Sequence, residues 1–213
     1  MTSPQPINPT LPVVPDAPDL PSPPQSLSSW RLWVPLLIQT ALILFIPIQY
    51  AATLATGKTV VLQTMPVDPY DLLRGYSQSL GYDISRVDTL RTLPGGDSLK
   101  DGQSGSVYVV LQAPTAPQPT RPPQPWRPVR VSHDRPTQLT ANQIAIKGQF
   151  NGWQITYGLE AYYMPEQQRD YLNQAIQRTQ SRNPRAMVLE VKLDGAGNAV
   201  PLALWVGDRD YRF

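Results

Sequence analysis

Hydrophobic residues are distributed along the chain as one long apolar run followed by many short ones. Residues 30–55 carry no charge after Arg31. As a helix, the uncharged stretch Leu32–Ala55 would rise about 36 Å, enough to cross a hydrocarbon core of about 30 Å with some tilt. Trp30 and Tyr50 lie toward its two ends, where amphipathic rings favour the membrane interface. The pattern predicts a transmembrane helix over residues 30–55.

A cleaved signal peptide is the alternative interpretation of this run, because Thr53-Leu54-Ala55 fits a small-residue cleavage site. Signal peptides have short basic leaders and apolar cores of about 7–15 residues, whereas a long leader without Lys or Arg precedes this longer core. A retained single-pass anchor is therefore favoured, with Pro47 expected to kink its last turns or end it. The orientation in the membrane is poorly defined by charge, because one basic residue lies near each end of the run, Arg31 before it and Lys58 after it. Because a lone N-terminal anchor commonly exports the domain on its C-terminal side, we expect a periplasmic or lumenal C-terminal domain.

After residue 59 the pattern changes to short β-prone runs separated by turn residues. The strongest hairpin signal is Asn151-Gly152, between QIAIKGQF and WQITYG, because Asn-Gly suits a type I′ turn. Residues 94–105 are expected to form an exposed loop. Strands are expected at Val60–Gln63, Tyr76–Ile84, Val107–Gln112, Val129–His133, Gln143–Phe150, Ala186–Leu193 and Ala199–Val206.

One amphipathic helix is expected from Pro165 to about Arg182. Pro165 fits the first helical position, and Glu166 fits the positive end of the helix dipole. The packing face of this helix comprises Tyr171, Leu172, Ala175, Ile176 and Thr179. These elements predict a mainly β fold, a small barrel or sandwich, with one flanking helix.

Proline divides the chain into regions. Nine of the 25 prolines fall within the first 24 residues, so residues 1–29 are expected to form a disordered, partly polyproline-II tail. Residues 113–128 hold seven prolines and are expected to form an irregular loop. The predicted organisation is a tail at 1–29, an anchor at 30–55 and an extracytoplasmic β-rich domain at 59–213.

Composition excludes several functional classes. Charged residues make up 16% of the chain and its net charge is +2, which argues against nucleic-acid binding. The absence of cysteine excludes disulfides and thiolate chemistry. The single histidine, His133, cannot form a His-rich metal site, and no G-x-S-x-G motif accompanies it. We interpret His133 as a surface residue and predict neither a cofactor nor a metal site.

Asp68, Asp71 and Arg74 form the first cluster of candidate site residues. Paired carboxylates can perform acid–base chemistry or bind a hard cation. The same residues also describe a turn in which the aspartates accept backbone N–H bonds and Arg74 pairs locally. Turn chemistry alone explains these residue types, so the structural interpretation is favoured.

The second cluster lies in residues 157–166, where two acids, three tyrosines and the start of the predicted helix occur together. These side chains could line a polar groove, or the tyrosines could be half-buried with their hydroxyls at the domain edge. The structural interpretation is again favoured. If Glu160 and Glu166 instead form an exposed binding face, replacing both with alanine should remove a partner interaction without preventing folding.

The stretch PVDPYDLLRGYSQSLGY resembles the defining segment of the bacterial GDYXXLXY family. Gly75, Leu80 and Tyr82 match that signature, whereas Tyr76 replaces its Asp and Ser77 replaces its Tyr. The second block of the resemblance, within residues 157–166, includes Gly158, Glu160, Tyr162, Tyr163, Pro165 and Glu166.

The resemblance covers roughly residues 30–205 and takes in Asp68, Asp71 and Arg74 as the family's usual lead-in. It implies a membrane-anchored protein with an extracytoplasmic domain and no established activity. Because Tyr76 stands where the family has an aspartate, the resemblance leans toward a non-catalytic role.

Two functions remain open. The first is a single-pass, non-enzymatic binding or assembly module, whose partners are the membrane and another membrane or envelope protein. The second is a divergent, inactive membrane hydrolase that resembles signal peptidases. In that case Thr64, just beyond the anchor, would take the place of the nucleophilic serine, and Lys147 would have to be desolvated to act as a base.

Overall fold

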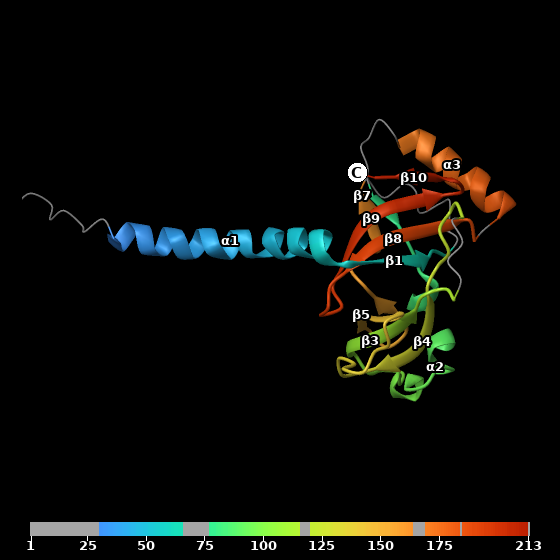
Figure 1. The fold of residues 1–213 in the computed structure, drawn as a ribbon, viewed down its shortest axis with the longest axis horizontal. Helices are drawn as coiled ribbons and strands as arrows, with labels where there is room; N and C mark the ends of the chain where they lie inside the picture. Colours follow the sequence, from blue (N-terminus) through green and yellow to red (C-terminus); the bar gives the residue numbers. More distant parts are fainter. Residues whose placement is uncertain (1–29, 66–76, 116–119, 164–168, 184, 213) are drawn as a thin grey trace, which may run out of the picture. The chain divides into compact units, whose positions relative to one another are not determined.

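The computed structural model describes residues 30–65, 77–115, 120–163, 169–183 and 185–212. The chain divides into two compact units, residues 1–42 and 43–213. The described part of the first unit is helical throughout. The second unit holds the strands of the fold (Figure 1). The predicted Pro-rich tail at 1–29 lies outside the described residues and stays a prediction.

Helix α1 extends over Trp30–Thr56 and contains the apolar run. An 18-residue window of this helix has a mean hydropathy of 1.9, so its 27 residues are long and apolar enough to cross a membrane. Large apolar side chains are exposed along it, among them Leu42 (69%) and Ile46 (73%). Of the two effects expected of Pro47, a kink or the end of the helix, the second is wrong, because α1 continues to Thr56.

The first four-stranded sheet is antiparallel, with the order β1-β8-β9-β10 (Figure 1). Its strands are β1 (Lys58–Gln63), β8 (Met187–Leu193), β9 (Ala199–Val206) and β10 (Arg209–Tyr211). The N-terminal strand therefore pairs with a strand from the C-terminal hairpin, with Lys58 opposite Leu193 and Gln63 opposite Val188. The last strand, β10, was not expected from the sequence.

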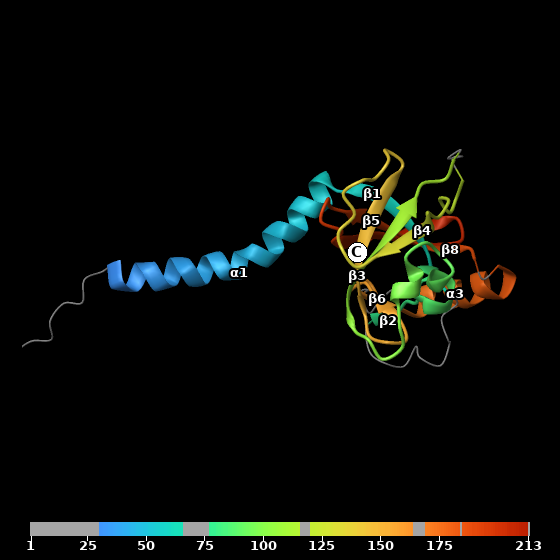
Figure 2. The ribbon, with the colours of Figure 1, turned by 90° about the horizontal axis from the view of Figure 1, so that it is seen from below.

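The second four-stranded sheet has the order β4-β3-β5-β6. Its strands are β4 (Arg127–Ser132), β3 (Gly105–Gln112), β5 (Gln143–Phe150) and β6 (Ile155–Thr156). Figure 2 shows β3, β4 and β5 close together below β1. The β3–β5 pair runs from Gly105 opposite Phe150 to Gln112 opposite Gln143. A separate two-stranded sheet joins β2 (Ser77–Ser79) to β7 (Ala161–Tyr163).

Side chains from both large sheets form one hydrophobic core. Val60 and Leu189 contribute from the first sheet, and Val107 and Ile146 from the second, each with no exposed surface. Alternate residues of these strands face the core because side chains alternate across a strand. Burying such a side chain stabilises the fold by about 1.5–3 kcal/mol.

One helix flanks the core, as the sequence predicted. Helix α3 (Arg169–Arg182) lies beside β9 and β10 in Figure 1. It packs Leu172 and Ile176 into the core. Tyr171, expected on the same face, is instead 54% exposed. A second, short helix, α2 (Val87–Arg91), was not predicted. The prediction of a mainly β fold with one flanking helix is confirmed.

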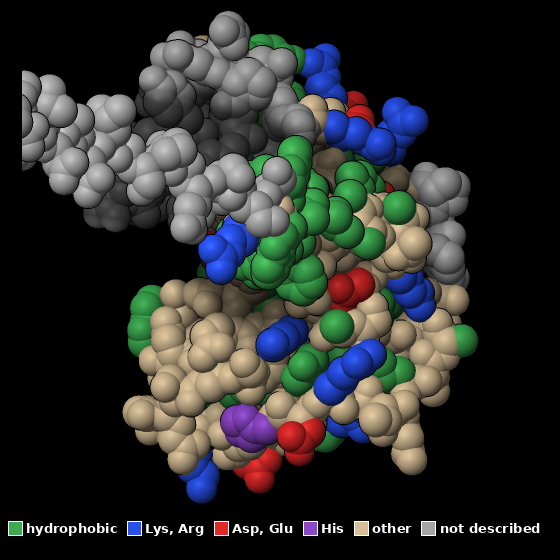
Figure 3. Space-filling view, turned by 90° about the vertical axis from the view of Figure 1, so that its left-hand side faces the viewer, with side chains coloured by type: hydrophobic (Ala, Val, Ile, Leu, Met, Phe, Trp, Pro, Cys, Tyr) green, Lys and Arg blue, Asp and Glu red, His purple; other side chains and the backbone are tan. Residues whose placement is uncertain are grey.

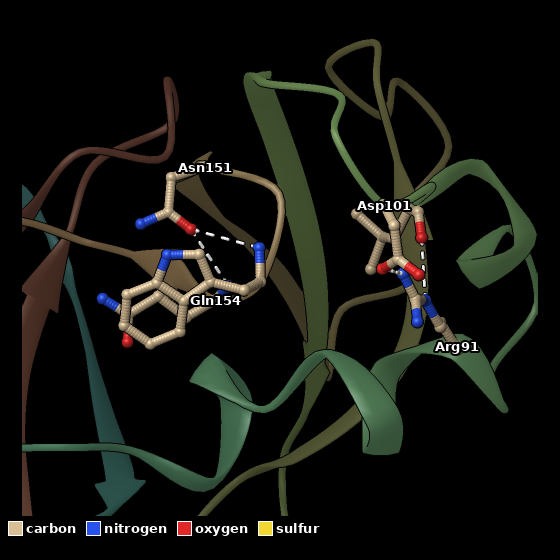
Figure 4. A network of polar contacts seen from close by, with 6 residues as sticks. Arg91, Asp101, Asn151 and Gln154 are labelled. Carbon is tan, nitrogen blue, oxygen red and sulfur yellow. Dashed lines mark hydrogen bonds and ion pairs between the residues drawn. The ribbon is translucent and has the colours of Figure 1, made fainter.

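The Asn151-Gly152 signal gives the expected hairpin between β5 and β6, but not the expected turn. A type I′ turn needs positive φ at both central residues, and only Gly152 has it, at 101°. The side chain of Asn151 instead accepts hydrogen bonds from the backbone N–H groups of Trp153 and Gln154 (Figure 4). The loop therefore spans four residues, closed by the Asn151 N–H bond to the Gln154 carbonyl at 3.2 Å.

The expected strand at Tyr76–Ile84 is also wrong in extent. Strand β2 covers only Ser77–Ser79, and a 3₁₀ turn forms at Asp83–Ser85. A further 3₁₀ turn, Gly96–Ser98, lies within the expected loop at 94–105. The ion pair between Arg91 and Asp101 joins the end of α2 to this loop (Figure 4).

Candidate functional site

The second half of the signature, Leu80 to Tyr82, belongs to the core. Leu80 is 1% exposed and Tyr82 has no exposed surface. Gly81 packs against Met65: a Cβ atom there would lie 2.5 Å from Met65 Cε, so the flexible Met65 side chain would have to move. The three positions therefore serve packing, and neither buried side chain is accessible to a ligand.

The two blocks of the family resemblance meet in the fold. Strand β2 of the first pairs with β7 of the second, with Ser77 opposite Tyr163 and Ser79 opposite Ala161. Leu80 N–H extends the ladder by donating to the Glu160 carbonyl at 2.7 Å. We call residues 77–85 and 157–163 together the motif seam.

Two buried tyrosines join the two segments of the motif seam, each donating a hydrogen bond to a backbone carbonyl of the other segment. The Tyr82 hydroxyl donates to the Leu159 carbonyl at 2.5 Å. The Tyr157 hydroxyl donates in the opposite direction, to the Ile84 carbonyl at 2.6 Å. Burial, aided by the nearby Glu160 carboxylate, raises the pKa of Tyr157 well above its ordinary value. Each segment thus satisfies a backbone carbonyl of the other with a protonated phenol.

Glu160 is part of the motif seam. Its carboxylate accepts a hydrogen bond from the Tyr157 backbone N–H at 2.5 Å, and the side chain is half-buried. Gly158 between them has a φ of 73°, a left-handed conformation that favours glycine, and a Cβ there would meet nothing within 4 Å. Glu160 and Gly158 therefore shape a tight turn, which gives both a structural role.

Most of the remaining candidates lie outside the described residues. Tyr162 and Tyr163 lie in β7 by their backbone. The candidates outside the described residues are Asp68, Asp71, Arg74, Gly75, Pro165 and Glu166. Among the described residues, no cluster of three or more His, Asp or Glu side chains could hold a metal ion.

The structure does not bring Thr64 and Lys147 together. Thr64 follows β1, is 2% exposed, and donates its hydroxyl hydrogen to the Met187 carbonyl at 2.8 Å. Lys147 lies on β5 of the other large sheet, with its side chain exposed. A general base needs hydrogen-bond reach of its nucleophile and a desolvated amine, and the geometry supplies neither.

His133 is exposed, as expected (Figure 3). Its Nε2 lies 3.4 Å from the Ser98 carbonyl.

The junction between α1 and β1 is held by side chains from β8 and from the turn between β8 and β9. Thr53, buried near the end of α1, donates its hydroxyl hydrogen to the Asp194 carboxylate at 3.3 Å. Lys192 Nζ donates to the Gly57 carbonyl at 3.1 Å. A Cβ at Gly57 would lie 2.4 Å from the Thr53 carbonyl oxygen, so only glycine fits this junction.

A pocket between α3 and the β9–β10 hairpin was missed by the sequence analysis. It has a volume of about 410 Å³. Its polar and charged lining includes Tyr171, Arg178, Arg182, Asp208, Arg209 and Tyr211. The i, i+4 spacing of Arg178 and Arg182 on the predicted helix was the available signal. Their approach to β10 could not be foreseen, since β10 itself was not predicted.

The fold and the motif seam together define a mainly β domain that directly follows a long apolar helix. A sequence model of the family described as GDYXXLXY protein matches residues 39–204. The match covers most of the chain and includes both segments of the motif seam, so the chain belongs to the GDYXXLXY family. No curated protein and no solved structure matched the chain.

Proposed function

We propose that this protein is a single-pass membrane protein whose β-rich domain lies outside the cytoplasm and acts as a non-enzymatic binding or assembly module. The observation that carries the proposal is the join between α1 and β1. A helix apolar on all sides needs an apolar environment that the domain's own core does not supply. Its described side chains are exposed from Trp30 to Ala52.

The fastened junction supports the retention of α1 with the domain. Thr53, Gly57, Lys192 and Asp194 connect the last turn of the helix to β8 and β9. Cleavage after Ala55 would separate Thr53 from Asp194 and cut the chain two residues before Gly57. In a signal peptide that is removed, these contacts would be lost on cleavage. In a permanent anchor, they connect the helix to the sheet.

The use of the motif residues also favours binding over catalysis. The polar groups of Tyr82, Tyr157 and Glu160 form hydrogen bonds with backbone groups within the motif seam. A catalytic group must instead reach the proton or atom on which it acts. This arrangement supports the role of a module that presents a stable surface to another envelope component.

The absence of cysteine from the chain allows a direct test of anchoring and orientation. A single cysteine is introduced at exposed Ser104, and a matched one at Ser22 in the leader, in full-length protein expressed in a bacterial host. We expect a membrane-impermeant maleimide to label Ser104→Cys in intact cells and Ser22→Cys only after lysis. Both variants should stay in the membrane after alkaline carbonate extraction.

The opposite labelling pattern would place the domain in the cytoplasm and overturn the orientation. Recovery of the protein in the soluble fraction, shortened to begin near residue 56, would overturn the retained anchor.

A further inference from the structure

We infer that the pocket between α3 and β10 is a binding site for a phosphate group. This inference rests on the proposal that the domain is a binding module and supplies the chemical class of its ligand. The pocket's volume of about 410 Å³ lies within the usual range for small-ligand sites. It is lined by three arginines and two tyrosines, drawn from two separate elements of the fold.

Charge is the first reason. Arg178, Arg182 and Arg209 face one carboxylate, Asp208, in the pocket lining. Among the described side chains the ion pairs are Arg91–Asp101 and Arg212–Asp210, so none of the three arginines has a carboxylate partner there. The lining therefore carries an excess of positive charge, which a bound anion would neutralise.

The origin of the arginines is the second reason. Arg182 lies in the last turn of α3, where a cation interacts favourably with the helix dipole. The dipole effect fades within one turn of the helix, so it does not explain the presence of Arg209, which belongs to β10. Arg178 and Arg182 stand four residues apart on one helix face, where like charges destabilise a helix. A third guanidinium group, that of Arg209 on strand β10, lines the same pocket, and three arginines gathered in this way are the arrangement of an anion site.

Pre-organisation is the third reason. Arg209 donates a hydrogen bond to the Tyr171 hydroxyl, which spans the pocket from β10 to α3. A guanidinium has five N–H donors, so most of those on Arg209 stay available to a ligand. Partial burial and neighbouring Tyr171 raise the pKa of Tyr211, against the opposing charge of Arg209. Tyr211 is hydrogen-bonded to Tyr171 and Arg209, so the three side chains form one connected group that links β10 to α3.

Phosphate fits this donor set better than a single carboxylate. Planar guanidinium groups bind phosphate oxygens through paired, charge-assisted hydrogen bonds. The tetrahedral oxygens of phosphate can accept bonds from three directions at once, which suits donors placed on a helix and on a strand facing it. A phosphate group reaches such a pocket either as part of a lipid headgroup or as a small soluble phosphate ester.

The test uses full-length protein in neutral detergent micelles and isothermal titration calorimetry. The probes are inorganic phosphate, glycerol 3-phosphate and dihexanoyl phosphatidylglycerol, with acetate as the carboxylate control. We expect the phosphate probes to bind and the Arg178→Ala/Arg182→Ala double variant to bind at least about tenfold more weakly. One charge-assisted hydrogen bond already accounts for about a factor of ten.

The matched control is Arg86→Ala/Arg121→Ala, which removes the same charge from exposed positions outside the pocket lining. It should bind like the unaltered chain. Tighter binding of the lipid probe than of glycerol 3-phosphate would assign the site to a headgroup, and equal binding to a soluble ester.

Three results would overturn the inference: no phosphate probe binds, acetate binds as tightly as phosphate, or both double variants lose binding equally. These outcomes are independent of the maleimide labelling, because binding is measured on purified protein. If no phosphate binds, the proposal of a membrane-anchored module still stands. If the labelling contradicts the proposed orientation, the inference of a phosphate site still stands. Far-ultraviolet circular dichroism of each variant confirms that it is folded.

Discussion

The motif seam and the α3–β10 pocket differ in how they use polar side chains. In the motif seam, the hydroxyls of Tyr82 and Tyr157 and the Glu160 carboxylate bond to nearby backbone groups. In the pocket, Arg178 and Arg182 remain exposed and their guanidinium groups have no carboxylate partner among the described residues. The segment richest in recognisable residues thus maintains the fold, while a region without a sequence motif presents charge to solvent.

This difference has a physical reason. A buried polar group must be hydrogen-bonded within the protein, so residues in the motif seam are constrained by each neighbour. An exposed arginine is satisfied by water and tolerates change, so it leaves little local pattern. We therefore expect substitutions in the motif seam to change the free energy of unfolding, and substitutions in the pocket to change binding alone.

The largest expected effect is that of Tyr82→Ala. It removes a fully buried ring from the core, which costs about 3–5 kcal/mol in the free energy of unfolding. Chemical denaturation of the full-length chain, followed by tryptophan fluorescence, measures the change. Tyr82→Phe is the control, because it keeps the ring and removes the hydroxyl that bonds to the Leu159 carbonyl. If the alanine variant is no less stable than the phenylalanine variant, Tyr82 does not belong to the core.

A smaller effect is expected from Tyr157→Phe. The ring stays in place, but the Ile84 carbonyl loses its donor, and an unsatisfied buried group costs about 1–3 kcal/mol. The same denaturation experiment measures it. Tyr171→Phe, at a half-exposed ring outside the motif seam, should change stability by less than about 0.5 kcal/mol. If Tyr157→Phe and Tyr171→Phe lower the free energy of unfolding equally, the hydrogen bond from Tyr157 to Ile84 does not stabilise the motif seam.

The junction at Asp194 should make stability depend on pH. Burial acts to raise the pKa of Asp194, but hydrogen bonds from Asn198, Ala196 and Thr53 outweigh it and hold the pKa below its ordinary value. A lowered folded-state pKa means that the carboxylate stabilises the fold above its unfolded pKa of about 4 and loses this effect as pH falls through the folded value.

We therefore expect stability to decline below about pH 4, and the decline to be shallower in Asp194→Asn. Near neutral pH this variant should lose about 1 kcal/mol, the contribution of a typical hydrogen bond. The free energy of unfolding, measured for both proteins across the acid range, checks the prediction. Identical pH profiles would show that Asp194 does not hold the junction.

The smallest expected effect on stability is that of Arg178→Ala/Arg182→Ala. Both side chains are exposed, so the free energy of unfolding should change by less than about 0.5 kcal/mol per site. The same variant is expected to lose phosphate binding. A loss of binding without a loss of stability would distinguish the pocket from the motif seam most clearly. A loss of stability comparable with that of Tyr157→Phe would mean that the pocket, like the motif seam, is structural.

The sequence by itself determined the local elements of this protein. Apolar length defined α1, and β-prone runs located strands such as β5 and β9 with the expected bounds. These features depend on residues close together in the chain, because helix and strand periodicity are local properties. The family segments were also recognisable, since each is a short contiguous stretch.

Only the tertiary structure decided which segments meet. Tyr82 and Leu159 are 77 positions apart, and no local pattern records that the hydroxyl of one satisfies the carbonyl of the other. The same holds for Arg209 and Tyr171, which are 38 positions apart and join β10 to α3. Strand pairing and core packing bring such residues together through long-range contacts. The sequence could therefore name the residues of the motif seam but not their role, and of the pocket it showed only the spacing of Arg178 and Arg182 on one helix face.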